Sequence, residues 1–177
     1  PRPLRPGDRA ASLAGVSARF VVVSGPPASG KSTLAPPLAA ALGLPLVAKD
    51  TIKDALMEVL PVPDVEVSRQ IGRAAVRAML AVAAASPVGA VIESNLYRSA
   101  AVHDLRALPG PVVEVFCRCD TAVAAERHFD GVRSPAELWN DEVGNPVAGG
   151  WPVLELDTSR PVDVDAVVAF VRAALAR

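Results

Sequence analysis

The chain has 177 residues, a formal net charge of −1 at pH 7 and a hydrophobic content of 51%. This length suits one domain that can bury a full core without help from a metal or a disulfide. The balanced charge provides no footprint for gripping many phosphates of a nucleic acid, and the longest apolar runs fall short of the ~18 residues that a membrane span needs, so we expect a soluble protein.

The first 19 residues contain several prolines and scattered charges, and they lack the apolar stretch of a signal peptide. We therefore expect a flexible or loosely docked arm at 1–19 and a single domain at 20–177, in the cytoplasm. From residue 20 onward, short apolar runs alternate with helical patterns. This alternation is typical of an α/β fold around a mainly parallel sheet that is buried on both faces.

The most informative segment follows the first expected strand, 20–24, and we call it the phosphate loop. It reads Gly25, Pro26, Pro27, Ala28, Ser29, Gly30, Lys31, Ser32 and Thr33, which fits the spacing G-x-x-x-x-G-K-[ST] between a strand and a helix. Gly25 and Gly30 let the backbone approach a polyphosphate, so that successive N–H groups form an anion nest. Lys31 is placed to reach the β- and γ-phosphates, and the Ser32 hydroxyl to bind Mg²⁺. The segment therefore predicts nucleotide binding.

The first expected helix covers 31–42 and ends at Gly43, whose position is typical of a helix C-terminus. Pro36 and Pro37 lie inside it. Because proline has no N–H, they should cost the bonds back to Ser32 and Thr33 and bend the helix.

Asp50 follows the second expected strand, 44–48, and opens a helix that we expect to end near Leu60. Ligands of open α/β sheets bind at the carboxyl ends of the strands, so Asp50 should face the same crevice as the phosphate loop. Two of the three lysines, Lys49 and Lys53, flank it, and such cations would keep it ionised and contact an anionic substrate. The alternative is that Asp50 only caps its helix.

The next expected helix, 65–85, carries Arg69, Arg73 and Arg77 at intervals of four residues. Such a stripe is typical of a solvated face, although it could also wall an acceptor pocket.

The third expected strand, 90–92, leads to Glu93, Ser94 and Asn95. Glu93 could hold Mg²⁺ through water or orient an acceptor, and Asn95 could bind substrate. The alternative is that Glu93 pairs with an arginine and Asn95 caps the helix expected at 99–107.

After the fourth expected strand, 112–117, Asp120 should cap a helix that carries Arg127. The polar stretch 129–135 then indicates a mobile flap, and Arg127 and Arg133 could clamp the phosphates when it closes. The alternative is that both are ordinary surface arginines. Cys117 and Cys119 are expected to be core thiols, and a short helix is expected at 137–143.

The fifth expected strand, 151–156, ends in a turn before the last expected helix, 164–175. The turn holds Thr158, Ser159, Arg160 and Pro161, which could flank an adenine or could form an ordinary capped turn.

These motifs resemble the small P-loop kinases, in the group of zeta-toxin kinases, chloramphenicol phosphotransferase and polynucleotide 5′-hydroxyl kinases, over about 20–176. The resemblance implies a P-loop NTPase fold with strand order 2-3-1-4-5 and ATP, or GTP, bound with Mg²⁺. It also implies that Asp50 is the general base, that Arg127 and Arg133 lie on a Lid, and that the turn 158–161 contacts the adenine. The chain departs from the family in its short length, its brief Lid and an acidic residue on the third strand that is Glu93 rather than Asp.

The leading functional hypothesis is ATP-dependent phosphorylation of a hydroxyl on a small molecule, such as an antibiotic, nucleoside, nucleotide sugar or other metabolite. A polynucleotide kinase is the second hypothesis, and the charge balance argues against it. The third is a regulatory switch that hydrolyses nucleotide slowly without an acceptor, and the flanked Asp50 argues against that.

Overall fold

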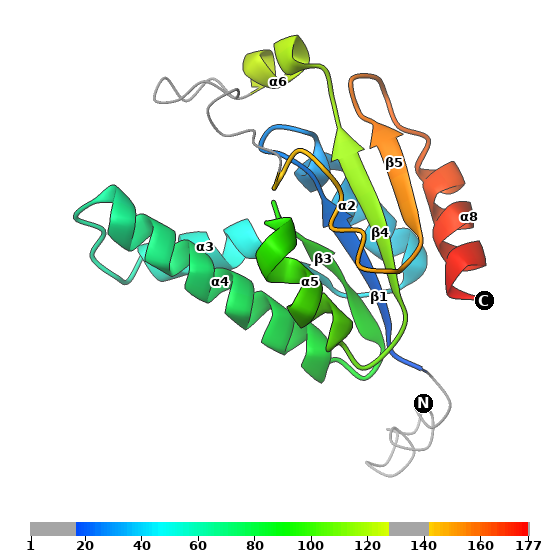
Figure 1. The fold of residues 1–177 in the computed structure, drawn as a ribbon, viewed down its shortest axis with the longest axis horizontal. Coiled ribbons are helices and arrows are strands. Elements are labelled where there is room, and N and C mark those ends of the chain that lie inside the picture. The colour runs from blue at the N-terminus through cyan, green and yellow to red at the C-terminus, as the bar shows by residue number, and fades with distance from the viewer. Residues whose placement is uncertain (1–16, 128–141, 177) are drawn as a thin grey trace, which may run out of the picture.

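A computed structural model describes residues 17–127 and 142–176, which form a five-stranded parallel sheet with helices on both faces (Figure 1). The strand order is β2-β3-β1-β4-β5, and every neighbouring pair is parallel. This confirms the predicted fold class and strand order. The strands are β1 (Arg19–Ser24), β2 (Leu46–Ala48), β3 (Gly89–Glu93), β4 (Val112–Arg118) and β5 (Val153–Asp157).

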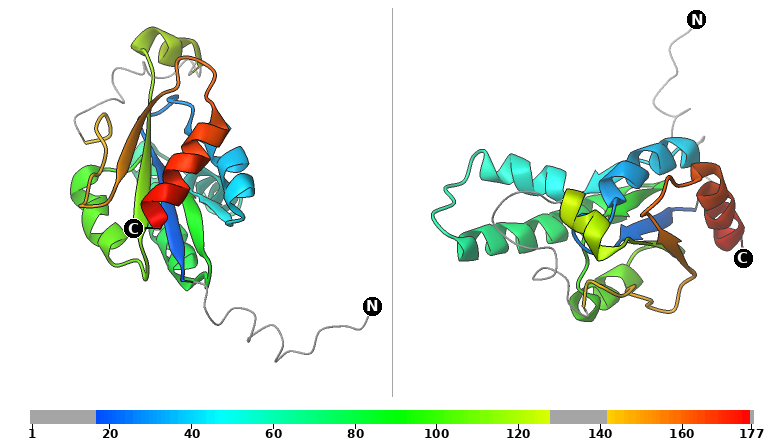
Figure 2. Two further views of the ribbon diagram at one scale, coloured as in Figure 1. Left: turned by 90° about the vertical axis from the view of Figure 1, so that its right-hand side faces the viewer. Right: turned by 90° about the horizontal axis from the view of Figure 1, so that it is seen from above.

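Helices cover the sheet in two layers, which lie on opposite sides of it in Figure 2. The helices of the described residues are α2 (Lys31–Leu42), α3 (Lys49–Met57), α4 (Val65–Ala85), α5 (Arg98–Arg106), α6 (Thr121–Arg127) and α8 (Val164–Leu175). Alternate residues of β1 point to opposite faces: Val21 and Val23 pack with α2 and α8, whereas Phe20 and Val22 pack with α4 and α5. Burial of both faces explains why the strand is one continuous apolar run.

Some predicted boundaries are wrong by a few residues. β2 begins at Leu46 rather than at residue 44, because the Leu44 N–H donates to the Ala39 carbonyl and closes the end of α2 beside the left-handed Gly43. α3 ends at Met57, short of the expected Leu60. The β3, α5, β4 and β5 bounds also differ from those expected by one or two residues.

Several predictions concern residues outside the described parts of the chain. The arm at 1–16, the flap at 129–135 and most of the helix expected at 137–143 belong to this group, although Glu142 and Val143 are described and form a turn. The division into an arm and one domain stays a prediction.

α2 runs without interruption from Lys31 to Leu42 and contains both prolines. Since neither proline has an N–H, the Ser32 and Thr33 carbonyls receive no helical bond from them. Pro36 and Pro37 are exposed, whereas Leu34, Ala35 and Leu38 face the core.

Glu114 in β4 is a fully buried carboxylate that joins the strand before the phosphate loop to the segment before β5. Its Oε1 accepts hydrogen bonds from the Ser24 hydroxyl at 2.6 Å and the Val147 N–H at 2.9 Å. Its Oε2 accepts from the Ala148 N–H at 2.9 Å and the Trp151 indole N–H at 3.0 Å. Four donors satisfy the carboxylate and hold the end of β1 in place.

Replacing Glu114 with alanine is expected to lower the free energy of unfolding by about 3–5 kcal/mol, because four donors, two of them in buried hydrogen bonds, lose their acceptor and a cavity forms. The measurement is urea unfolding of the purified variant. Glu155→Ala is the matched control, since Glu155 lies on the neighbouring strand and forms an exposed ion pair with Arg118. Equal changes in the two variants would contradict a structural role for the buried carboxylate.

Candidate functional site

The phosphate loop connects β1 to α2 and has the backbone of an anion-binding turn. Gly25 has a φ of 139°, and a Cβ there would lie 2.1 Å from the Cys117 carbonyl oxygen, so only glycine fits. Ala28 and Gly30 also have left-handed backbones, with φ of 61° and 82°. Gly30 stands at the N-terminus of α2, where free N–H groups and the helix dipole favour a phosphate. These features fit a bound polyphosphate.

Lys31 lies across this loop. Its side chain is buried, and its Nζ donates to the Pro26 carbonyl oxygen at 2.7 Å. Burial lowers the pKa of Lys31, and the negative charges of Glu93 and Asp50 oppose that shift. Burial raises the pKa of Glu93, while Lys31 acts in the other direction. The sheet edge therefore brings a buried cation together with two carboxylates, as the sequence predicts.

Asp50 lies in the first turn of α3, at the carboxyl end of β2. Its carboxylate is 64% exposed and pairs with the Lys49 ammonium at 2.5 Å. Lys49 also donates to the Asn95 Oδ1 at 3.1 Å, which links the ends of β2 and β3. The N-cap of α3 is Ala48, so the interpretation of Asp50 as a helix cap is wrong. Asp50 is thus an accessible carboxylate at the edge that carries the phosphate loop.

The sequence leaves two structural roles open at the carboxyl end of β3: an ion pair with an arginine for Glu93 and a helix cap for Asn95. The described residues show neither role. The N-cap of α5 is Tyr97, so Asn95 is not a helix cap. Within residues 17–127 and 142–176, Glu93 forms no ion pair with an arginine.

The two lysines on either side of Asp50 differ in their contacts. The Lys53 Nζ donates to the Ser68 hydroxyl of α4 at 3.1 Å, so this ammonium binds α4. Lys49 forms the ion pair with Asp50. Of the cations expected to keep Asp50 ionised, Lys49 is therefore the one in direct contact.

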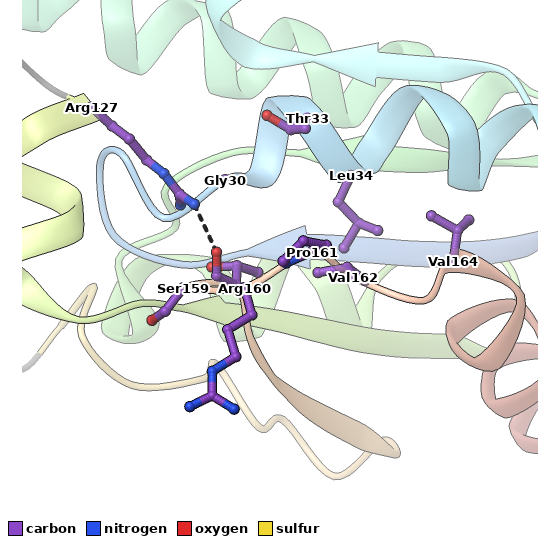
Figure 3. Close-up of a pocket in the computed structure, with 10 residues that line it drawn as sticks. Gly30, Thr33, Leu34, Arg127, Ser159, Arg160, Pro161, Val162 and Val164 are labelled. Atoms are coloured by element: carbon purple, nitrogen blue, oxygen red, sulfur yellow. Dashed lines mark hydrogen bonds between the residues drawn. The ribbon is translucent and has the colours of Figure 1, made fainter.

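A pocket of about 380 Å³ lies between the phosphate loop and the turn that follows β5, on the side of the loop away from Asp50 (Figure 3). The predicted adenine turn forms one wall, and the Thr158 hydroxyl binds the Ser29 carbonyl oxygen of the loop at 2.6 Å. Arg127 from α6 enters the pocket, and its Nη2 donates to the Thr158 carbonyl oxygen at 2.8 Å. The lining consists of Gly30, Thr33, Leu34, Arg127, Thr158, Ser159, Arg160, Pro161, Val162 and Val164. Its apolar members offer a surface for a planar base.

The turn beside this pocket also has the features of a capped turn. The Asp157 carboxylate accepts from the Ser159 N–H at 2.9 Å, and the Asp163 carboxylate caps α8 by accepting from the Ala166 N–H. Asp120 likewise accepts from the Ala122 N–H at 2.8 Å at the start of α6, as the sequence predicts. The turn that holds Thr158 therefore has local capping bonds and also contacts the phosphate loop.

Replacing Arg127 with alanine is expected to lower kcat by about 10²-fold or more, the scale of losing one charged stabiliser of a transition state, with a smaller loss of nucleotide affinity. Steady-state kinetics beside a nucleotide titration measure both effects. Arg118→Ala is the control, because Arg118 is exposed and pairs with Glu155 outside the pocket. A loss of affinity alone would assign Arg127 to ground-state binding. The same kinetic expectation holds for Arg133, which lies outside the described residues.

Mg²⁺ usually keeps several waters and takes only one or two protein ligands together with phosphate oxygens. The exposed Ser32 hydroxyl at the start of α2 and the Glu93 carboxylate fit that pattern. In the described part of the chain, no three His, Cys, Asp or Glu side chains form a dedicated metal cluster.

We expect Ser32→Ala to raise the Mg²⁺ concentration needed for half-maximal activity. Overlapping metal titrations of the variant and the parent would remove Ser32 as a ligand.

The two cysteines are buried and free, which confirms that they are core thiols. Burial raises the pKa of Cys117 to about 12, so this thiol stays protonated near neutral pH. No helix in residues 17–127 or 142–176 is both long enough and apolar enough to cross a membrane.

Comparisons with known proteins agree with this architecture. The family model of the AAA domain matches residues 20–135. A candidate kinase from Chloroflexus aurantiacus is 30% identical, with a TM-score of 0.81 and coverage of 92% of this chain and 98% of that chain. No curated protein sequence matches the chain.

Two further solved structures share the fold at lower identity. A gluconokinase from Sinorhizobium meliloti is 24% identical with a TM-score of 0.62, covering 92% of this chain and 93% of that chain. The APS kinase of Mycobacterium tuberculosis, in complex with AMPPNP and APS, is 18% identical with a TM-score of 0.60, covering 91% of this chain and 99% of that chain.

Proposed function

The chain belongs to the AAA domain family, and on this premise we propose that it is an ATP-dependent kinase that moves the γ-phosphate to a hydroxyl group of a small molecule. The kinase descriptions of the similar structures support this proposal. The finer resemblance to the zeta-toxin, chloramphenicol phosphotransferase and polynucleotide kinase group stays a prediction. We place the protein in the cytoplasm, where reduced cysteines are ordinary.

The observation that carries the proposal is the exposed Asp50 carboxylate at the same sheet edge as the phosphate loop. The pocket beside Thr158 suits the adenine, and the loop backbone and Lys31 suit the phosphates. Asp50 and its partner Lys49 lie on the side away from that pocket, next to Asn95. A nucleotide on one side and a carboxylate on the other is the arrangement that transfer to an alcohol requires.

The proposed reaction uses these positions. The acceptor oxygen forms a bond to the γ-phosphorus, the bond from that phosphorus to the β–γ bridging oxygen breaks, and the hydroxyl proton passes to Asp50. Lys31 stabilises the negative charge on the transferred group, and Arg127 and Arg133 add to it. When bound at Ser32 and Glu93, Mg²⁺ would neutralise phosphate charge. ADP and the phosphorylated alcohol are the products.

The proposal is tested by screening hydroxyl compounds for acceptor-dependent ADP release and by weighing each hit for one added phosphate. We expect at least one compound to gain a single phosphate in step with ADP. ADP release that no compound accelerates would favour the nucleotide switch instead.

A further inference from the structure

A cavity of about 500 Å³ lies between α4 and α5, away from the nucleotide pocket. Asn95 lines it, and the Lys49 ammonium binds both Asn95 and Asp50. Asn95 therefore connects the cavity wall to the cluster that holds the proposed base. Its volume falls within the range of about 300–1,000 Å³ that is common for pockets of drug-sized ligands.

Apolar side chains form much of the cavity wall. Val76 from α4 and Ala100 from α5 line it, together with Leu96 from the segment between β3 and α5. Tyr97 is 52% exposed and lies at the same wall. A half-exposed aromatic ring beside aliphatic groups suits the flat or apolar face of a ligand.

The two arginines of the cavity each pair with a carboxylate. Arg73 pairs with Glu66 at 2.9 Å, and Arg77 lies 3.4 Å from the Asp104 carboxylate. Each arginine of the cavity thus has a carboxylate beside it, although Glu66 also lies 3.9 Å from Arg69. An anionic ligand would have to displace those carboxylates or share the wall with Asp104, and both cost electrostatic energy.

We propose that this cavity binds the body of the acceptor and that the acceptor is an uncharged alcohol with an aromatic or other apolar body. The inference rests on the proposed kinase function and narrows its substrate class. The reacting hydroxyl lies at Asp50, where it loses its proton as its oxygen bonds to the γ-phosphorus and ADP departs. Asn95 hydrogen-bonds the acceptor between the base and the cavity.

The test uses the full chain with Mg²⁺ and ATP and compares uncharged aromatic alcohols with carboxylates of similar size. Thymidine, adenosine and 1-phenylethane-1,2-diol are the uncharged probes, and mandelate is the carboxylate counterpart of the diol. Ala100→Trp places a large ring at an exposed position of the cavity wall. His103→Trp is the matched control, because His103 is an exposed residue of α5 that does not line the cavity.

We expect kcat/KM for at least one uncharged alcohol to exceed that for the carboxylate at least ten-fold. Ala100→Trp should lower that value at least ten-fold at an unchanged melting temperature, whereas His103→Trp should leave it unchanged. Phosphorylation confined to the carboxylate, equal activity of Ala100→Trp and parent, or no phosphorylation of any uncharged probe would overturn the acceptor class. These outcomes spare the kinase assignment as long as some other hydroxyl compound of the screen accelerates ADP release, and ADP release that no compound accelerates would remove the assignment itself.

Discussion

Lys31→Ala is expected to reduce phosphate transfer to background while the fold stays intact. The Lys31 ammonium is the cation held across the phosphate loop, 2.7 Å from the Pro26 carbonyl oxygen, at the start of α2. Its charge matters most where negative charge gathers on the transferred group, so its loss should act on kcat more than on nucleotide affinity. A loss of at least 10²-fold is the scale for one such stabiliser.

The stability of this variant follows from the pKa of Lys31, which burial lowers. The window runs from the lowered pKa of Lys31 in the folded chain to its ordinary pKa in the unfolded chain. At a pH inside this window the unfolded chain binds more protons, so the free energy of unfolding rises with pH. Below the window the buried charge opposes folding in full, and Lys31→Ala removes this cost. The variant also loses the hydrogen bond to the Pro26 carbonyl oxygen, which acts in the opposite direction, so its melting temperature should stay close to that of the parent at neutral pH.

The measurement is ATP turnover and melting temperature on one preparation of Lys31→Ala. Arg172→Ala is the control, because it also removes a cation, but one on α8 that binds the Ala41 carbonyl oxygen. Unchanged turnover in Lys31→Ala would remove the site assignment.

Asp50→Asn is expected to lower phosphate transfer by roughly 10²- to 10⁴-fold, the range for a positioned general base. An alcohol is a poor nucleophile near neutral pH, and a carboxylate within about 2.6 to 3.2 Å can accept its proton as the new bond forms. Asparagine keeps the size of the side chain and its acceptor oxygen towards Lys49, but it has no basicity. Nucleotide binding and melting should barely change, since Asp50 is largely exposed and does not line the nucleotide pocket.

Asp54→Asn is the matched control for this change. Asp54 is an exposed aspartate one helical turn further along α3, and it should tolerate the substitution with near-parental transfer. If Asp50→Asn transfers phosphate as fast as Asp54→Asn, Asp50 is not the base and Glu93 is the next carboxylate to test.

Much of the fold is predictable from the sequence because its signals are local. The phosphate loop combines a fixed spacing with a strand before it and a helix after it, and the bounds of α2 and α4 agree with those expected. The alternation of apolar runs and helical patterns is also a local signal, and it predicts a parallel sheet. The interpretation of Asp50 as a helix cap fails because α3 begins at Lys49, two residues before the start that a cap at Asp50 requires, which places Asp50 inside the first turn.

Features that depend on residues far apart in the chain are not predictable in this way. The four donors to Glu114 come from Ser24 and from the segment 147–151, and the local signal is one acidic residue within an apolar run. The bond from Lys49 to Asn95 spans 46 positions. All three arginines of the α4 stripe are exposed, as their periodicity predicts, but periodicity alone cannot show that two of them also line the cavity beside α5.

The fate of the γ-phosphate tests the central claim most directly. The full chain is incubated with Mg²⁺, ATP labelled with ¹⁸O in its γ-phosphate, and an acceptor from the screen, and the products are identified by mass. The account predicts that the labelled phosphate appears on the acceptor in equal amount to ADP, and that Asp50→Asn slows this transfer. Label found only in free phosphate, at a rate that the acceptor does not change, would contradict a kinase and identify a nucleotide hydrolase.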